Sequence, residues 1–166
     1  QALRAGEKRQ ETGKGRGGLT IWLPLERWRE QRVFWLGLSR PAPQPVRLIL
    51  QPLLPTRETE GDPRWEEWHC YLFPLAVGMG DYQRLLAGCF ACAYPTRDAI
   101  DGAPAAALDP CSPNRLAAGD WERITAAVRQ EMAGASRKKA RFYDRFLRWT
   151  EAALTHTDII IADGNQ

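Results

Sequence analysis

The segment from residue 137 to residue 149 combines positive charge and aromatic rings in a pattern that suits phosphate binding. It reads RKKARFYDRFLRW and holds six cations and four aromatic residues. Each residue of an α-helix advances about 100° around the axis. Four arginines therefore fall on one arc: Arg137, Arg141, Arg145 and Arg148. Because a guanidinium is always charged and binds phosphates or carboxylates through paired N–H groups, an exposed arc of this kind suits a polyanion or an acidic protein surface.

A plain solvated helix face is the alternative interpretation of this arc, since Arg is a good helix former. Two features argue against it. Asp144 is the one acid between Arg137 and Arg148, so pairs at i,i+4 cannot neutralise the arc. Lys14 and Arg16 also lie in a basic, glycine-rich stretch typical of segments that wrap nucleic acid. We expect the phosphate contacts to come from Arg137, Lys138, Arg141, Arg145, Arg148, Lys14 and Arg16.

The cysteines offer a second possible chemistry. Cys89 and Cys92 have the C-x-x-C spacing that can hold one zinc ion. A structural zinc site usually brings together two such close pairs, however, and this chain has one. The apolar residues around the pair favour buried cysteines on a helix instead. We therefore predict no cofactor, and keep zinc as an alternative with weak candidate ligands at Cys70, Cys89, Cys92 and Cys111.

Catalytic motifs are scarce in this chain. It contains two histidines and lacks the Gly-x-Ser-x-Gly and His-Glu-x-x-His patterns. Carboxylates gathered near one another can hold Mg²⁺ for phosphodiester cleavage, and the candidates are Asp98, Asp101, Asp109, Asp158 and Asp163. Acids in loops are mostly turn formers and caps. The sequence therefore favours a protein that is not an enzyme, with a metal-dependent nuclease or a zinc-bearing enzyme as an alternative.

Composition bounds the remaining possibilities. The chain has 166 residues, 44% of them hydrophobic, which suits one domain with a real core. The net charge of +3 is mild but unevenly spread, because residues 56–68 are acidic whereas residues 1–18 and 120–148 are basic. No apolar run is long enough to span a membrane, and four cysteines do not make a disulfide-dense secreted domain. We predict a cytoplasmic protein without membrane partners, and the abundance of Trp, Arg, Pro and Ala suggests a bacterial source.

The elements that must position these residues follow from periodicity. We predict a flexible basic arm over residues 1–18 and a single α+β domain over residues 19–166. Alternating or continuous apolar residues predict strands at 19–25, 32–38, 46–53 and 68–77, with a closing strand at 159–161. Close connections between the first four strands favour a small antiparallel meander.

Two helices complete the predicted fold. Asp81 is a suitable cap for a short helix over residues 82–93, and Asp120 for a long C-terminal helix. Apolar positions in that second helix keep steps of three and four from Val128 to Ala153. One long helix, or two nearly collinear helices with a bend at Gly134, would satisfy this register. We expect the sheet to pack against both helices.

These observations lead to one functional expectation and two alternatives. We expect a nucleic-acid-associated subunit of a larger assembly, binding RNA or DNA phosphates through a basic helix face. Seven Trp are many for this length, and Trp65 and Trp68 are candidate anchors for other protein subunits. The alternatives are a scaffold subunit whose basic face meets an acidic partner, and the metal-dependent enzyme described above.

Overall fold

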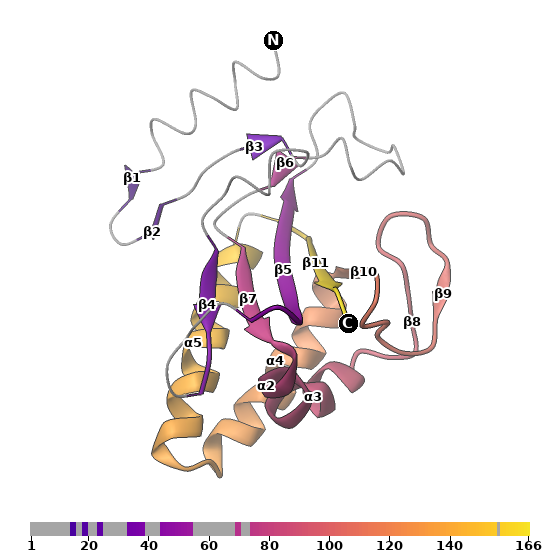
Figure 1. The fold of residues 1–166 in the computed structure, drawn as a ribbon. Helices are drawn as coiled ribbons and strands as arrows, with labels where there is room; N and C mark the ends of the chain where they lie inside the picture. The colour runs from indigo at the N-terminus through magenta and orange to yellow at the C-terminus, as the bar shows by residue number, and fades with distance from the viewer. Residues whose placement is uncertain are drawn as a thin grey trace.

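The fold is described from a computed structural model, which confirms the predicted α+β class (Figure 1). The described residues are 14–15, 18–19, 23–24, 33–38, 44–54, 69–70, 74–155 and 157–166. They form a seven-stranded mixed sheet, two separate two-stranded pairs and three helical segments.

The main part of the sheet has five strands. From one edge to the other they are β10 (Pro113–Ala117), β11 (Ile159–Gly164), β5 (Arg47–Leu54), β7 (Leu75–Gly78) and β4 (Phe34–Leu36). The far end of β5 pairs with β6 (His69–Cys70), which in turn pairs with β3 (Leu23–Pro24). β4 and β7 are parallel, and the other pairs are antiparallel.

The sheet is wider than the predicted meander, and its strand order differs. β7 lies between β4 and β5, although β4 and β5 are neighbours in the sequence, and β11 enters beside β5 from the far end of the chain. Burial accounts for the place of β11. Ile160 and Ile161 point to opposite faces of the sheet and are both fully buried. A strand that is apolar on both faces suits an interior position in the sheet, here between β10 and β5.

Two further strand pairs lie outside this sheet. β1 (Lys14–Gly15) pairs with β2 (Gly18–Leu19), and β8 (Thr96–Arg97) pairs with β9 (Pro104–Ala105). The first pair falls at the end of the segment predicted to be a flexible arm, of which the structure describes only residues 14, 15 and 18.

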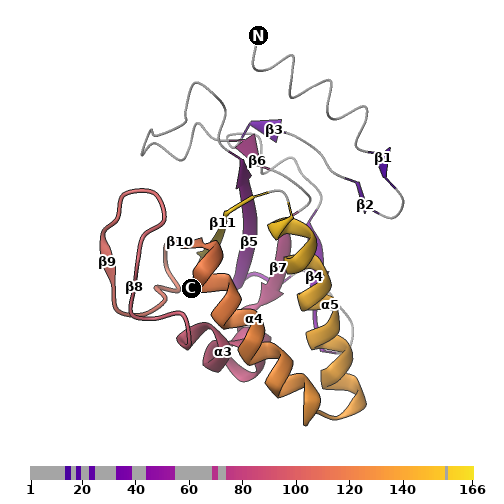
Figure 2. The ribbon, with the colours of Figure 1, turned by 180° about the vertical axis from the view of Figure 1, so that it is seen from behind.

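The helices cover one face of the sheet, as the two opposite views show (Figures 1 and 2). The short helix runs without interruption through α2 (Met79–Asp81), the π-helical turn η3 (Tyr82–Leu86) and α3 (Ala87–Ala91). It begins three residues before the predicted start, so Asp81 lies inside its first turn and does not cap it. The Asp81 carboxylate instead accepts a hydrogen bond from the Leu38 backbone N–H at 3.3 Å.

The C-terminal helical region contains two helices, α4 (Ala118–Ala133) and α5 (Arg137–Leu154). The break comes at Gly134, as predicted, but the helices are not collinear. The chain reverses over residues 134–136, and α5 returns alongside α4 (Figure 2). Steps of three and four place apolar residues on one side of each helix whether the helices are collinear or antiparallel, so the pattern could not distinguish the two arrangements.

Asp120 stabilises the start of α4 from inside the helix. It is the third helical residue, and its carboxylate accepts a hydrogen bond from the Ala117 backbone N–H at 3.0 Å. The same buried carboxylate accepts bonds from Thr96 Oγ1 and Arg123 Nη2, both at 2.6 Å. Asp120 therefore also ties β8 to α4.

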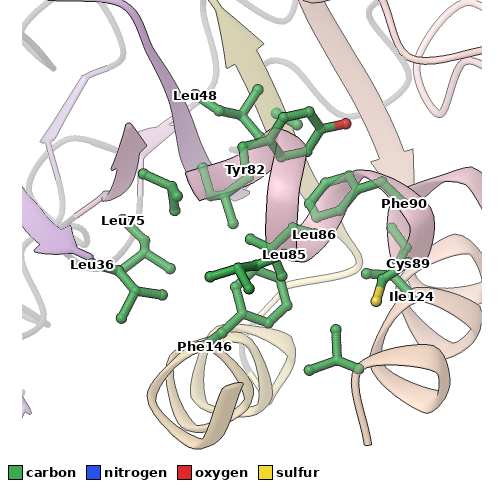
Figure 3. Close-up of a cluster of buried hydrophobic side chains, with 14 of the residues drawn as sticks. Leu36, Leu48, Leu75, Tyr82, Leu85, Leu86, Cys89, Phe90, Ile124 and Phe146 are labelled. Carbon is green, nitrogen blue, oxygen red and sulfur yellow. The ribbon is translucent and has the colours of Figure 1, made fainter. Parts of the chain in front are cut away.

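The core lies between the sheet and the helices (Figure 3). Leu36, Leu48 and Leu75 enter it from three strands, and Phe146 enters it from α5. Phe90 lies fully buried at its centre. The Phe90 ring makes edge-on contacts with three other rings, those of Tyr82, Trp121 and Phe146, at centroid distances of 5.3, 5.5 and 6.2 Å.

Candidate nucleic-acid interface

Helix α5 carries the predicted interface, and its local sequence explains its orientation. Ser136 caps it by accepting a hydrogen bond from the Lys139 backbone N–H at 3.5 Å. Phe142 and Phe146 pack into the core, and Trp149 is half-buried. Because the apolar side is fixed in this way, the neighbouring arc must face outward.

The outward arc holds the predicted cations. The side chains of Arg137, Lys138, Arg141 and Arg145 are all exposed, and no ion pair or hydrogen bond involving them occurs among the described residues. Arg148 differs from these four. Its Nε lies 3.0 Å from Asp144 Oδ2, so its charge is partly compensated, although the side chain is 80% exposed.

The four unpaired cations line a groove of about 330 Å³. Phe142 forms part of its apolar lining, and its opposite wall is Gly37 and Leu38, which follow β4. Sequence reasoning missed this wall, because nothing in residues 37–38 indicates that they lie beside a helix one hundred positions later. The hydrogen bond from the Leu38 N–H to Asp81 holds the wall in place.

The start of α5 adds to the positive potential of the groove. Arg137, Lys138 and Lys139 occupy the first turn, which contains no acid. A helix N-terminus carries about half a positive charge from its aligned peptide dipoles. The three side-chain charges and this backbone charge have the same sign. They therefore repel one another, and together they make the first turn of α5 one electropositive site.

The other predicted phosphate contacts are not placed beside this groove. Lys14 lies in β1, where only the backbone is described, and Arg16 lies outside the described residues. The described residues also do not include Trp65, Trp68 or the acidic segment 56–67. The interface that the structure describes is thus the helical part alone.

The cysteines occupy different surroundings. Cys89 is buried in the core, and this burial raises the pKa of its thiol to about 11, with smaller contributions from Glu131 and Cys92. Cys92 is exposed and donates a weak hydrogen bond to the Gly88 carbonyl. Cys111 is also exposed, and Cys70 is described only by its backbone. Over the described residues there is no group of three or more His, Cys, Asp or Glu side chains placed to hold a metal ion.

The carboxylates predicted as magnesium ligands at positions 98, 101 and 109 stabilise the loop in which they lie. The Arg115 guanidinium binds Asp98 at 2.7 Å and Asp101 at 2.9 Å. Asp109 accepts a hydrogen bond from the Cys111 backbone N–H at 2.9 Å, and this bond lowers the pKa of Asp109. Two of the acids predicted as magnesium ligands are therefore bound to an arginine, and a third stabilises its own turn.

No protein-family model, curated protein or solved structure matches this chain. None of the helices in the described part of the chain combines the length and hydrophobicity required to cross a bilayer.

Proposed function

We propose that this protein binds nucleic acid through the groove beside α5, as a binding subunit and not as an enzyme. The observation that carries the proposal is the set of four exposed cations on one helix face, with no anionic partner among the described residues. Arg137, Arg141 and Arg145 follow one another at intervals of four residues. They span about 12 Å along the helix axis at 1.5 Å per residue.

The spacing of these cations suits a phosphate chain. A duplex presents one phosphate per strand about every 3.4 Å along its axis, so a row of this length faces several phosphates in succession. Guanidinium groups bind phosphate oxygens through two parallel hydrogen bonds, which favours the three arginines over a row of lysines.

The energetics of the first turn argue against a merely solvated face. Each cation at an exposed helix N-terminus costs about 0.3–1 kcal/mol through its interaction with the helix dipole. Acids are the residues that stabilise this position, yet Arg137, Lys138 and Lys139 occupy it. A turn that lowers the stability of its own helix is explained by a function that needs the charge.

Binding to DNA and RNA at several salt concentrations tests the proposal. The logarithm of the association constant should fall with log[salt], with a slope of about −0.9 per phosphate neutralised on duplex DNA and about −0.7 on a single strand. Replacing Arg137, Arg141, Arg145 and Arg148 together with Gln should flatten this slope. All four are exposed, so the variant should keep its circular dichroism spectrum.

Gel shifts with competitors separate nucleic acid from an acidic protein as the partner. Retention on heparin cannot separate them, because a basic face binds heparin whether its natural partner is nucleic acid or an acidic protein. Unlabelled DNA or RNA should displace the labelled strand, whereas an acidic protein at equal charge should not. An unchanged salt slope in the fourfold variant would remove α5 from the site. Displacement by the acidic protein at a lower concentration than that of unlabelled DNA or RNA would favour the scaffold alternative.

A further inference from the structure

A second hollow adjoins the basic groove and differs from it in character. It has a volume of about 340 Å³ and shares Gly37 with the groove. It lies where the parallel strands β4 and β7 end, and where the helix that starts at Met79 begins. Its lining is mixed: Pro45 and Val46 contribute apolar surface, and Gln44, Asp81 and Arg84 contribute polar groups.

The two hollows differ in the charge of the residues that line them. Every charged residue that lines the basic groove is a cation. The second hollow contains Asp81 and Arg84, which lie 2.8 Å apart and neutralise each other. A ligand that fits both is anionic at one end and carries little net charge at the other, where Val46 is 42% exposed.

We infer that the two hollows together bind single-stranded nucleic acid in preference to duplex. Phosphates of the strand lie against Arg137, Arg141 and Arg145, and an unpaired base enters the second hollow beyond Gly37, where both apolar and polar side chains are available to it. Each hollow lies at the lower end of the volume range of small-ligand sites, so it accepts a nucleotide-sized group. Bases in a duplex are stacked and paired inside it, whereas those of a single strand can turn out into such a hollow.

The inference rests on the proposed function and adds a strand preference to it. RNA and DNA both present phosphates and flat bases, and nothing in the lining distinguishes the two sugars. Oligo-dT and oligo-U are therefore separate arms of the test, and a difference between them identifies which of the two the site prefers.

Gly80 offers a direct way to fill the hollow. It lines the hollow, and the nearest atom to a side chain added there would be Arg84 Nη2, at 4.0 Å. Gly80→Phe therefore enters open space. Gly88 is the matched control, because it lies on the same continuous helix, has nothing within 4 Å of an added Cβ and lines neither hollow. Val46→Asn removes apolar surface without filling the space and serves as a second variant.

The experiment measures fluorescence anisotropy with labelled ten-nucleotide oligo-dT and oligo-U and with a twenty-base-pair duplex, all at one salt concentration. Wild type should bind the preferred single strand more tightly than the duplex. Gly80→Phe should weaken single-strand binding roughly 5-fold, the lower end of the range for one base contact, because no aromatic ring of the described residues lines the hollow; it should leave duplex binding unchanged. Val46→Asn should weaken single-strand binding to a smaller extent, and Gly88→Phe should match wild type.

The outcomes separate this inference from the proposed function. Duplex binding as tight as single-strand binding, with no effect of Gly80→Phe or Val46→Asn, would overturn the strand preference and leave the basic groove as the binding site. Absence of salt-dependent binding to any of the three probes would overturn both.

Discussion

Two adjacent lysines in the first turn of α5 allow stability and binding to be tested against each other. Lys138 and Lys139 are both exposed and occupy consecutive helical positions, but only Lys138 lines the basic groove. Replacing either with Glu exchanges a repulsion from the helix dipole for an attraction. Because each of these contributions is about 0.3–1 kcal/mol, each variant should raise the free energy of unfolding by about 0.6–2 kcal/mol.

The gain should be larger at position 139. Ser136 already caps the helix by accepting a bond from the Lys139 N–H. A Glu at this third helical position can accept a hydrogen bond from the Ser136 backbone N–H in return, which completes a capping box. Lys139→Glu should therefore lie at the upper end of the range and Lys138→Glu below it.

Binding should respond in a different order. Lys138→Glu removes one cation from the groove, so the slope of log K against log[salt] should become shallower by at least 0.7–0.9, the value of one phosphate contact. Lys139→Glu acts only from beside the groove. Charges are screened over about 8 Å at physiological salt, so its effect on the slope should be the smaller of the two.

Urea unfolding and salt-dependent anisotropy measure the two quantities on the same samples. Both variants should be more stable than wild type, and Lys138→Glu should show the larger loss of binding. A loss of stability in both variants would contradict the electrostatic account of the first turn. Equal changes of slope would show that the groove does not distinguish Lys138 from Lys139, and would refute the geometry on which the interface is built.

Three further predictions concern the fold. Phe90→Ala should lower the free energy of unfolding by about 3–5 kcal/mol in urea titrations, because Phe90 is fully buried among three rings; a loss below 1 kcal/mol would contradict this. At pH 8 a thiol pKa near 11 leaves Cys89 about a hundredfold less thiolate than an ordinary thiol of pKa 9.0, so mass spectrometry after brief alkylation should find Cys92 modified and Cys89 intact. Burial raises the pKa of Asp163 above 3.8, opposed by Arg47. At Asp163 the folded protein thus binds more protons than the unfolded chain just above pH 3.8, so the contribution of this carboxyl to stability should fall there as pH rises. The difference in urea midpoint between wild type and Asp163→Asn should therefore change across this range, and a constant difference would contradict the assignment.

Local patterns in the sequence predicted the elements of this fold well. The strand predicted at 46–53 is β5, and the apolar steps of three and four up to Ala153 identified the buried side of α5. Each of these inferences needs only the period of side chains along one element. The α+β class follows from the same information, since it depends on which elements exist and not on how they pair.

These patterns could not predict which strands pair with each other or in which direction the elements run. β11 lies beside β5, and both strands are buried on two faces; that match emerges only when distant segments are compared. The groove wall at Gly37 and Leu38 is a further case, since a strand end and a helix start meet there through the tertiary fold. The prediction identified which cations of α5 face outward, but not what they face.

The reversal at residues 134–136 changes the meaning of the basic segment. In one continuous helix Arg137, Lys138 and Lys139 would lie in the middle, where the peptide dipoles cancel between neighbouring turns and a cation has little interaction with them. In the observed hairpin they lie at the positive end of a new helix. The same residues therefore produce a stronger local potential and a larger cost in stability than the sequence pattern alone implies. For this reason the first turn of α5, more than the arginines further along the helix, is where a functional origin of the charge can be distinguished from an incidental one.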